Sequence, residues 1–201
     1  MFKGKNVNVV RKFFHLYIFV VFMPALYMDS EAVVLCVKVG CCGLALLEIY
    51  RYECFKCKRG DGGLGEVFKG FKDEKDSKGG GGYEVFLSHI SLLFATVATV
   101  RRDGGREKYI GIVLVCVCDS MSAVVGSLYG RYKIPGNLSP RTLEGFTAFL
   151  LTAYVWVRFG MRGGGMEEMD LLGIYIVSAM EAGTEGIDNI ILPVLGAVIW
   201  A

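Results

Sequence analysis

The stretch YIGIVLVCVCDSMSAVVGSLY, from Tyr109 to Tyr129, decides the fold class of this chain. It is long enough to cross a bilayer as a helix, because a hydrocarbon core of about 30 Å needs about 20 helical residues. Lipid offers backbone groups no hydrogen-bond partners, so we expect a membrane-spanning helix. A single acidic residue, Asp119, interrupts the stretch.

Apolar segments of the same character recur along the whole chain. Just over half of its 201 residues are apolar, and the charged residues are concentrated in blocks between the apolar runs. The other segments are Phe13–Met28, Ala32–Tyr50, Val85–Val100, Phe146–Phe159, Met169–Met180 and Ile187–Ala201. The last three are shorter, so some could tilt, borrow flanking residues or enter the membrane without crossing it. We therefore expect one domain over residues 1–201, an all-α polytopic transmembrane helical bundle with about six or seven spans.

Basic residues are distributed unequally between the two sets of connecting segments. With seven spans, one side receives the N-terminus, the 51–82 loop, the 130–145 loop and the 183–186 turn, which together hold fifteen Lys and Arg residues. The opposite side holds six. The positive-inside rule places the first side in the cytosol. The glycine-rich, charged 51–82 loop is expected to be a largely flexible cytosolic linker.

Asp119 and Ser120 lie inside an apolar run, where an unpaired carboxylate would be costly. The carboxylate must face a polar cavity, a cation or a basic partner. A charged residue at such a depth favours a functional site. A purely structural ion pair between two helices remains the alternative.

The residues after Asp119 change from small to basic. Gly126 and Gly130 permit close approach of a backbone or a ligand, and Arg131 and Lys133 then emerge on the cytosolic side. This order suits a magnesium–phosphate site, with a carboxylate for the metal, glycines beside the oxygens and cations for the remaining charge. Asp119 is therefore the candidate ligand for Mg²⁺ or another divalent cation.

Polar residues also gather at the mouths of the last three apolar segments. Arg141, Thr142, Glu144 and Gly145 precede one of them, where the simpler interpretation is a helix capped by Thr142 with Glu144 in its first turn. That interpretation does not exclude a catalytic role.

A further acidic and polar group flanks the turn before the last apolar segment. Glu181, Asp188 and Asn189 are expected to form a second wall of the same site, with surface capping as the alternative. Basic residues at the start of the first apolar segment, Lys12 and His15 among them, are interpreted as interfacial anchors that reach water.

Four stretches of the chain resemble the dolichol kinase family, part of a wider group of CTP-using polyprenol, phytol and diacylglycerol kinases. They are RKFFHLYIFVVFMPAL from Arg11, FKDEKDSKGGGGYEVFLSHISLLFA from Phe71, DSMSAVVGSLYGRYKIPG from Asp119 with RTLEG from Arg141, and EAGTEGIDNIILP from Glu181. The last resembles dolichol kinases rather than the wider group. The resemblance covers nearly the whole chain and corresponds to the C-terminal catalytic part of longer members.

This resemblance implies a phosphotransferase with an alcohol acceptor. The chain would transfer the γ-phosphoryl group of CTP to dolichol, in the endoplasmic reticulum membrane, with its nucleotide site facing the cytosol. The product, dolichyl phosphate, carries glycans for protein glycosylation. Dolichol, CTP and the lipid bilayer are the implied partners, and no nucleic acid is expected.

The resemblance also implies which residues form the site, because the motifs of the family can be matched to stretches of this sequence. The implied catalytic candidates are Asp119, Glu144 and Asp188, with magnesium at Asp119. The implied nucleotide and phosphate contacts are Ser120, Gly126, Gly130, Arg131, Lys133, Arg141, Thr142 and Gly145. The implied supporting residues are Asp73, Asp76, Ser88, His89, Glu181 and Asn189, although a histidine at a helix start is more often an interface residue than a ligand.

One departure bears on phosphate binding. Arg141 stands where the family usually has lysine, and arginine keeps the charge while gripping phosphate bidentately. The alternatives are a diacylglycerol or phytol kinase and a cytidylyltransferase that makes CDP-lipid. Outside the enzyme class, a small membrane transporter could also carry buried acids.

Overall fold

The computed structural model describes residues 3–56, 92–95, 97, 100, 105–134, 141–184 and 188–200. Most of the expected segment Val85–Val100 and most of the 51–82 loop lie outside these residues, although 92–95 and 97 within the former are helical. Over the part that is described, the chain is helical, with one isolated antiparallel bridge between Lys133 and Thr142. The all-α prediction is confirmed for this part.

The other six expected segments all form helices. They are α1 (Lys3–Met28), α2 (Ser30–Lys56), a continuous run of η2 (Arg106–Tyr109), α5 (Ile110–Val113), η3 (Leu114–Cys118) and α6 (Asp119–Tyr129), a second run of α7 (Leu143–Val155) and η4 (Trp156–Met161), then α8 (Glu168–Gly183) and α9 (Asp188–Trp200). Two boundaries differ substantially: α1 begins at Lys3, ten residues before the expected Phe13, and α2 continues to Lys56, so the first six residues of the expected 51–82 loop are helical. Within the described residues, two stretches are long and apolar enough to qualify as membrane spans, Ser30–Leu47 and Arg106–Tyr129. The count of six or seven spans stays a prediction.

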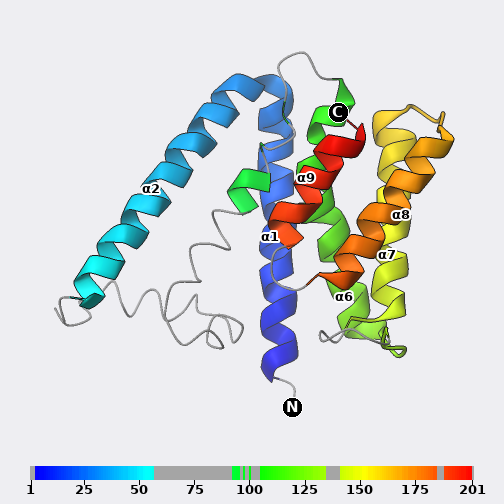
Figure 1. Cartoon of the computed structure of the whole chain (residues 1–201), viewed down its shortest axis with the longest axis horizontal. Coiled ribbons are helices and arrows are strands. Elements are labelled where there is room, and N and C mark those ends of the chain that lie inside the picture. The colour runs from blue at the N-terminus through cyan, green and yellow to red at the C-terminus, as the bar shows by residue number, and fades with distance from the viewer. Residues whose placement is uncertain are drawn as a thin grey trace.

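The helices alternate in direction and form a bundle from which α2 leans away (Figure 1). The chain begins, α6 ends and α7 begins at one end, which we call the N-terminal end. The opposite end, the far end, holds the α1–α2 turn and the connection from η4 to α8. The described parts of the more basic connections, the N-terminus and the α6–α7 connection, therefore lie at the N-terminal end.

The last two helices form a hairpin that is shorter than the bundle. α8 and α9 contain 16 and 13 residues, so they are about 24 and 20 Å long, less than a hydrocarbon core of about 30 Å. Their turn stops short of the N-terminal end reached by α1 and α7 (Figure 1). The hairpin therefore brings the last residues of α8 into the interior of the bundle.

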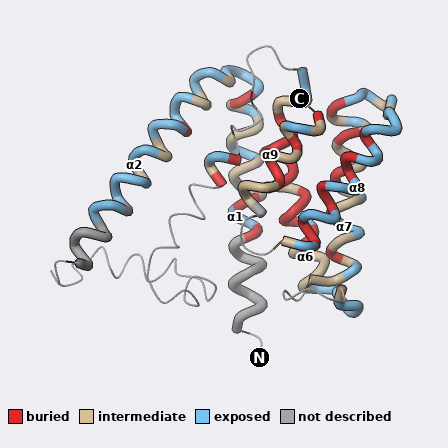
Figure 2. The backbone as a smooth tube through the Cα atoms, viewed as in Figure 1, coloured by how far each residue is buried: buried red, intermediate tan, exposed pale blue. Residues whose placement is uncertain are grey.

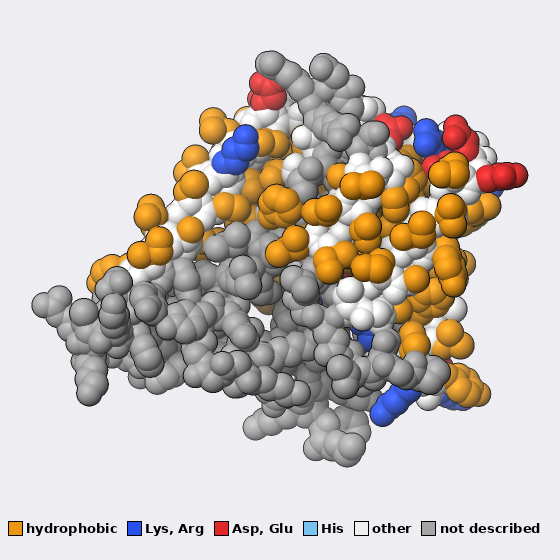
Figure 3. Space-filling view, viewed as in Figure 1, with side chains coloured by type: hydrophobic (Ala, Val, Ile, Leu, Met, Phe, Trp, Pro, Cys, Tyr) orange, Lys and Arg blue, Asp and Glu red, His pale blue; other side chains and the backbone are white. Residues whose placement is uncertain are grey.

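Burial is concentrated between the central helices (Figure 2). The core is formed by the 110–118 run together with side chains of α7, α8 and α9, among them Phe149, Val177 and Leu192. In contrast, α2 exposes large apolar side chains such as Leu46, which is 67% exposed. Hydrophobic side chains cover most of the described surface in Figure 3, with charged ones mainly near the two ends. This surface is consistent with insertion into a membrane.

Candidate functional site

Two buried ion pairs lie inside the bundle. Lys12 on α1 pairs with Asp119, the first residue of α6. These two residues are only 9% and 2% exposed. The second pair joins Arg141, just before α7, to Glu181 near the end of α8, which is 1% exposed. We call these four side chains the interior charge network.

Hydroxyl groups tie the two pairs to the same helix. Ser122 Oγ donates to Glu181 Oε1 at 3.2 Å, and Ser120 Oγ donates to the Lys12 carbonyl oxygen at 3.3 Å. Asp119 and Ser122 are three residues apart on α6, so they share one helix face. The charge of Arg141 also acts on Asp119, which couples the two pairs electrostatically. Residues of three other segments, α1, the start of α7 and α8, thus converge on this face of α6.

A π-helical turn precedes Asp119 directly. The turn η3, Leu114–Cys118, ends where α6 begins. Its extra residue rotates everything that follows by roughly 100° relative to an uninterrupted α-helix. Because π-turns inside α-helices are rare and frequent at functional sites, the local backbone supports a special role for Asp119.

A short backbone ladder positions basic residues at the N-terminal end. Lys133 and Thr142 form an antiparallel bridge, and Leu143 N–H donates to the Tyr132 carbonyl oxygen at 2.8 Å. The side chains of Arg131 and Lys133 are exposed there. These backbone bonds therefore hold two exposed cations, Arg131 and Lys133, close to Arg141, whose guanidinium reaches into the bundle.

The start of α7 is capped as the sequence predicts. Thr142 Oγ1 accepts a hydrogen bond from Gly145 N–H at 3.2 Å. The Glu144 carboxylate accepts hydrogen bonds from the backbone N–H groups of Arg131, at 2.9 Å, and Tyr132, at 3.3 Å. These bonds, that of Arg131 first, lower the pKa of Glu144 below its ordinary value. Glu144 thus fixes the loop, and as an engaged, ionised carboxylate it is a weak base.

The glycines expected beside phosphate oxygens pack helix against helix instead. A Cβ on Gly126 would lie 2.9 Å from Thr142 Oγ1, and one on Gly145 would lie 2.9 Å from the Ser122 carbonyl oxygen. Gly130 is similarly closed by Thr142. The observed role of these glycines is the close approach of α6 and α7, which sets the distance between Asp119 and the residues at the start of α7.

Several expected site residues cannot be placed. Asp73, Asp76, Ser88 and His89 lie outside the described residues. Asp188 begins α9, but its side chain is also outside the description, and Asn189 beside it is half-buried. Of the expected second wall, Glu181 is brought to the face of α6 that carries Asp119.

The structure adds two residues that sequence reasoning placed elsewhere. Lys12 and His15 were expected to reach water as interfacial anchors, and this is wrong: His15 is 5% exposed and Lys12 is buried against Asp119. The charge of His15 also acts on Asp119. Their spacing of three residues places both on one face of α1, a signal that they turn inward together.

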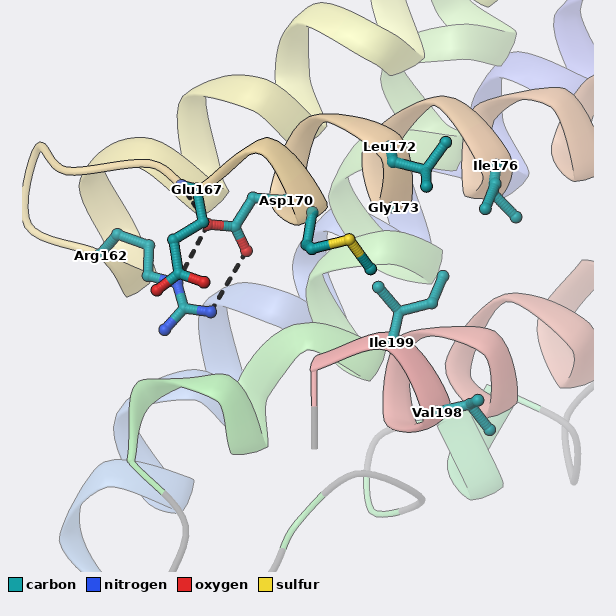
Figure 4. Close-up of a pocket in the computed structure, with 9 residues that line it drawn as sticks. Arg162, Glu167, Asp170, Leu172, Gly173, Ile176, Val198 and Ile199 are labelled. Atoms are coloured by element: carbon teal, nitrogen blue, oxygen red, sulfur yellow. Dashed lines mark hydrogen bonds and ion pairs between the residues drawn. The ribbon is translucent and has the colours of Figure 1, made fainter.

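A different charged cluster occupies the far end (Figure 4). Arg162 donates two hydrogen bonds to Asp170, each of 3.2 Å, and Trp200 Nε1 donates a third at 3.0 Å. The Glu167 backbone N–H adds a fourth at 3.0 Å. A cleft of about 370 Å³ opens beside the cluster, between α8 and α9. With its carboxylate fully engaged, this cluster fastens the ends of three helical segments and is poorly suited to bind a ligand.

The interior charge network offers donors of the type magnesium prefers. Asp119 and Glu181 provide carboxylate oxygens, and Mg²⁺ carried by phosphates needs only one or two carboxylates in addition to phosphate oxygens and water. In the described ranges, no group of three or more His, Cys, Asp and Glu side chains is placed to hold a metal.

Comparison with curated proteins returns one kind of relative. The chain is 24% identical to the dolichol kinase of Saccharomyces cerevisiae over 199 residues, which is 94% of this chain and 36% of the relative. It is 26% identical to the dolichol kinase of Homo sapiens over 210 residues, 95% of this chain and 37% of the relative. The Arabidopsis thaliana dolichol kinase EVAN is 24% identical over 93% of this chain and 34% of the relative.

The chain spans little more than a third of the length of these relatives. No solved structure and no family model matches it. The matched region covers 93 to 95% of this chain.

Proposed function

Since this chain is a relative of the dolichol kinases, we propose that it phosphorylates dolichol with CTP as the donor, in the membrane of the endoplasmic reticulum. One observation carries the proposal. Two acids and two cations converge on one face of α6, inside a bundle whose outer surface is apolar. Such groups are costly at that depth, so a charged ligand gives the reason for keeping them.

The cations would hold the phosphates. Arg141 is part of the buried network, while Arg131 and Lys133 are exposed at the N-terminal end, so positive charge extends from the surface inward. A triphosphate entering from that end would meet the exposed pair first. Positioning and charge stabilisation supply most of the rate in phosphoryl transfer.

The acids would hold a magnesium ion that accompanies the nucleotide. Asp119 is the proposed ligand, with Glu181 close enough in the network to assist. When bound, Mg²⁺ would neutralise charge on the phosphate oxygens. Asp119 and Glu181 would orient the triphosphate through that charge.

The hydroxyl of dolichol would meet the nucleotide at the same level of the bundle. The polyprenol tail is too apolar to leave the bilayer, so we propose lateral entry between helices, with the N-terminal end facing the cytosol. Glu144 is a poor candidate for accepting the hydroxyl proton, because two backbone N–H groups occupy its carboxylate. Asp188, at the start of α9, is the better of the two candidates.

The direct test uses protein purified in detergent. γ-Labelled CTP and ATP are each offered with dolichol, diacylglycerol or phytol, and the labelled lipids are separated. We expect label in dolichyl phosphate with CTP, and CDP as the second product. Label in phosphatidic acid or phytyl phosphate would identify a different lipid kinase. Pyrophosphate release when a lipid phosphate such as phosphatidic acid is offered as the acceptor would identify a cytidylyltransferase that makes CDP-lipid.

A variant pair links that activity to the network. Asp119→Asn should lower turnover about 100-fold or more, because it removes the charge proposed to bind the metal. Asp29→Asn is the matched control, since Asp29 caps α2 at the far end by accepting hydrogen bonds from Glu31 and Ala32 N–H groups. Asn caps helices equally well, so this variant should keep full activity.

A further inference from the structure

Lys12 occupies the position of a counter-ion to the proposed metal ligand. Its ammonium pairs with Asp119, and its carbonyl oxygen accepts the Ser120 hydroxyl. α1 is therefore fixed to the start of α6 by two adjacent contacts. The pair is cut off from water, since Lys12 is 9% exposed and Asp119 is 2% exposed.

Stabilisation of the fold does not by itself explain why Lys12 and Asp119 are paired in the interior. Replacing a buried ion pair with well-packed apolar side chains is often neutral or stabilising. The rest of α1 shows that apolar packing is available to it, since Leu26 is 1% exposed within the core. A lysine at such a position points to a function for its charge.

The charge balance of the network suggests that function. Lys12, Asp119, Arg141 and Glu181 contribute two positive and two negative charges, so the network is neutral as it stands. A triphosphate with a divalent cation can enter a desolvated, neutral place only if every charge finds a new partner. The acids must then turn to the cation, and the basic side chains must turn to the phosphates.

Resting on the function proposed above, we propose that Lys12 is a tethered counter-ion that leaves Asp119 for the phosphates when metal and nucleotide bind together. Lysine suits this role, because its ammonium is a point charge on a flexible stem that needs no fixed geometry. In the free protein, Lys12 neutralises Asp119 and keeps metal alone from binding. Metal and nucleotide binding are therefore positively coupled, each making the other more favourable.

The test measures metal binding without nucleotide. Thermal unfolding of the detergent-solubilised protein is followed with and without Mn²⁺ for the wild type, Lys12→Met and the control Lys38→Met, which changes an exposed lysine of α2. The wild type and the control should not respond to Mn²⁺ alone. Lys12→Met should unfold about 5 °C lower or more, because Asp119 is left buried and unpaired. Mn²⁺ alone should restore most of that loss.

A double variant keeps the test decisive if the single variant does not fold. Lys12→Met with Asp119→Asn removes both charges, so it should fold without metal and show no response to Mn²⁺. The proposal is overturned if Mn²⁺ leaves Lys12→Met unchanged, or if wild type and Lys12→Met respond equally. It is likewise overturned if Mn²⁺ stabilises the double variant, because the ion then binds elsewhere.

These outcomes are separate from those of the kinase assay. A wild-type protein that turns over no nucleotide, with a Lys12→Met variant rescued by Mn²⁺, would remove the proposed reaction and keep the counter-ion role. Normal turnover of CTP by the wild type, with no response of Lys12→Met to Mn²⁺, would keep the proposed reaction and remove the counter-ion role. In the active enzyme, Lys12→Met should lower kcat at saturating metal while lowering the metal concentration needed for half-maximal binding.

Discussion

The two ends of the last hairpin carry similar ion pairs in opposite surroundings. At the far end, Asp170 accepts hydrogen bonds from Arg162, Trp200 and a backbone N–H, so its carboxylate has no capacity to spare. Inside the bundle, Glu181 pairs with Arg141 and takes one hydroxyl hydrogen bond from Ser122. An arginine–carboxylate pair can therefore fasten helices or keep its charges available to a ligand, depending on how completely the carboxylate is hydrogen-bonded.

The difference also has an electrostatic side. The carboxylates of both pairs, Asp170 and Glu181, are almost completely buried, while Arg162 is about one-third exposed and Arg141 about one-fifth, so water shares somewhat more in solvating the far pair. The charges of Lys12, His15 and Arg141 all act on Asp119. Arg162 likewise acts on more than one acid, since it pairs with Glu107 at 3.7 Å as well as with Asp170, so the two sites differ chiefly in how completely their carboxylates are engaged.

Among the changes that compare the two ends of the hairpin, Arg141→Gln should produce the largest effect on activity. The variant keeps a hydrogen-bonding group near Glu181 and loses the charge proposed to bind phosphate. We expect turnover to fall about 100-fold. Arg141→Lys should retain most of it, because lysine keeps the charge. If Arg141→Gln is as active as Arg141→Lys in the labelled-CTP assay, the phosphate role of Arg141 is wrong.

Arg162→Gln applies the same change at the far end and should affect stability instead. Asp170 keeps its bonds to Trp200 and the backbone, so we expect a loss of about 2 kcal/mol. Thermal unfolding in detergent should report a midpoint lower by about 4–8 °C. Activity per folded molecule should stay at the wild-type level. A large fall in kcat with unchanged stability would mean that the two ends do not differ as described.

Gly126→Ala tests the spacing of α6 and α7 behind the network. The added Cβ would lie 2.9 Å from Thr142 Oγ1, which is held as the cap of α7, and 3.5 Å from the Cα of Gly145. We expect a loss of about 1–2 kcal/mol from overpacking, with a reduced kcat because Arg141 moves with α7. Gly43→Ala on α2 is the control, since a Cβ there meets nothing within 4 Å. Equal midpoints for the two variants in thermal unfolding would contradict the close contact.

The sequence predicted the acidic residues of the interior charge network, because a carboxylate among apolar neighbours is costly in free energy. Asp119 was recognisable because it interrupts an apolar run, and Glu181 because it lies beside a short turn between apolar segments. The structure brings both to one face of α6. The Thr142 cap also followed from a local pattern, whereas α1 begins earlier and α2 ends later than their apolar segments indicated. The short lengths of the last segments were visible in the sequence, and they explain why Glu181 reaches the interior.

The partner of Asp119 could not be predicted in the same way. Lys12 is 107 positions away in sequence, and a lysine at the start of an apolar helix has the local pattern of an interfacial anchor. Its inward direction depends on how α1 packs against α6, which is a tertiary property. The glycines are a related case: their small size predicted the close approach of a backbone or a ligand, and the fold shows that α7 approaches them.

Glu144→Gln should have the smallest effect, and its pH dependence tests the α6–α7 connection. Hydrogen bonds from Arg131 and Tyr132 lower the pKa of Glu144, so its ionised form stabilises the folded state. That contribution is present above the unfolded-state value of about 4.3 and disappears as the pH falls through the lower folded-state value. Gln keeps an accepting oxygen and lacks the charge. The unfolding midpoints of wild type and Glu144→Gln should therefore differ slightly at pH 7 and converge as the pH falls below about 4. A difference that grows with acidification would reverse the sign of this linkage and remove Glu144 as the group that holds the connection.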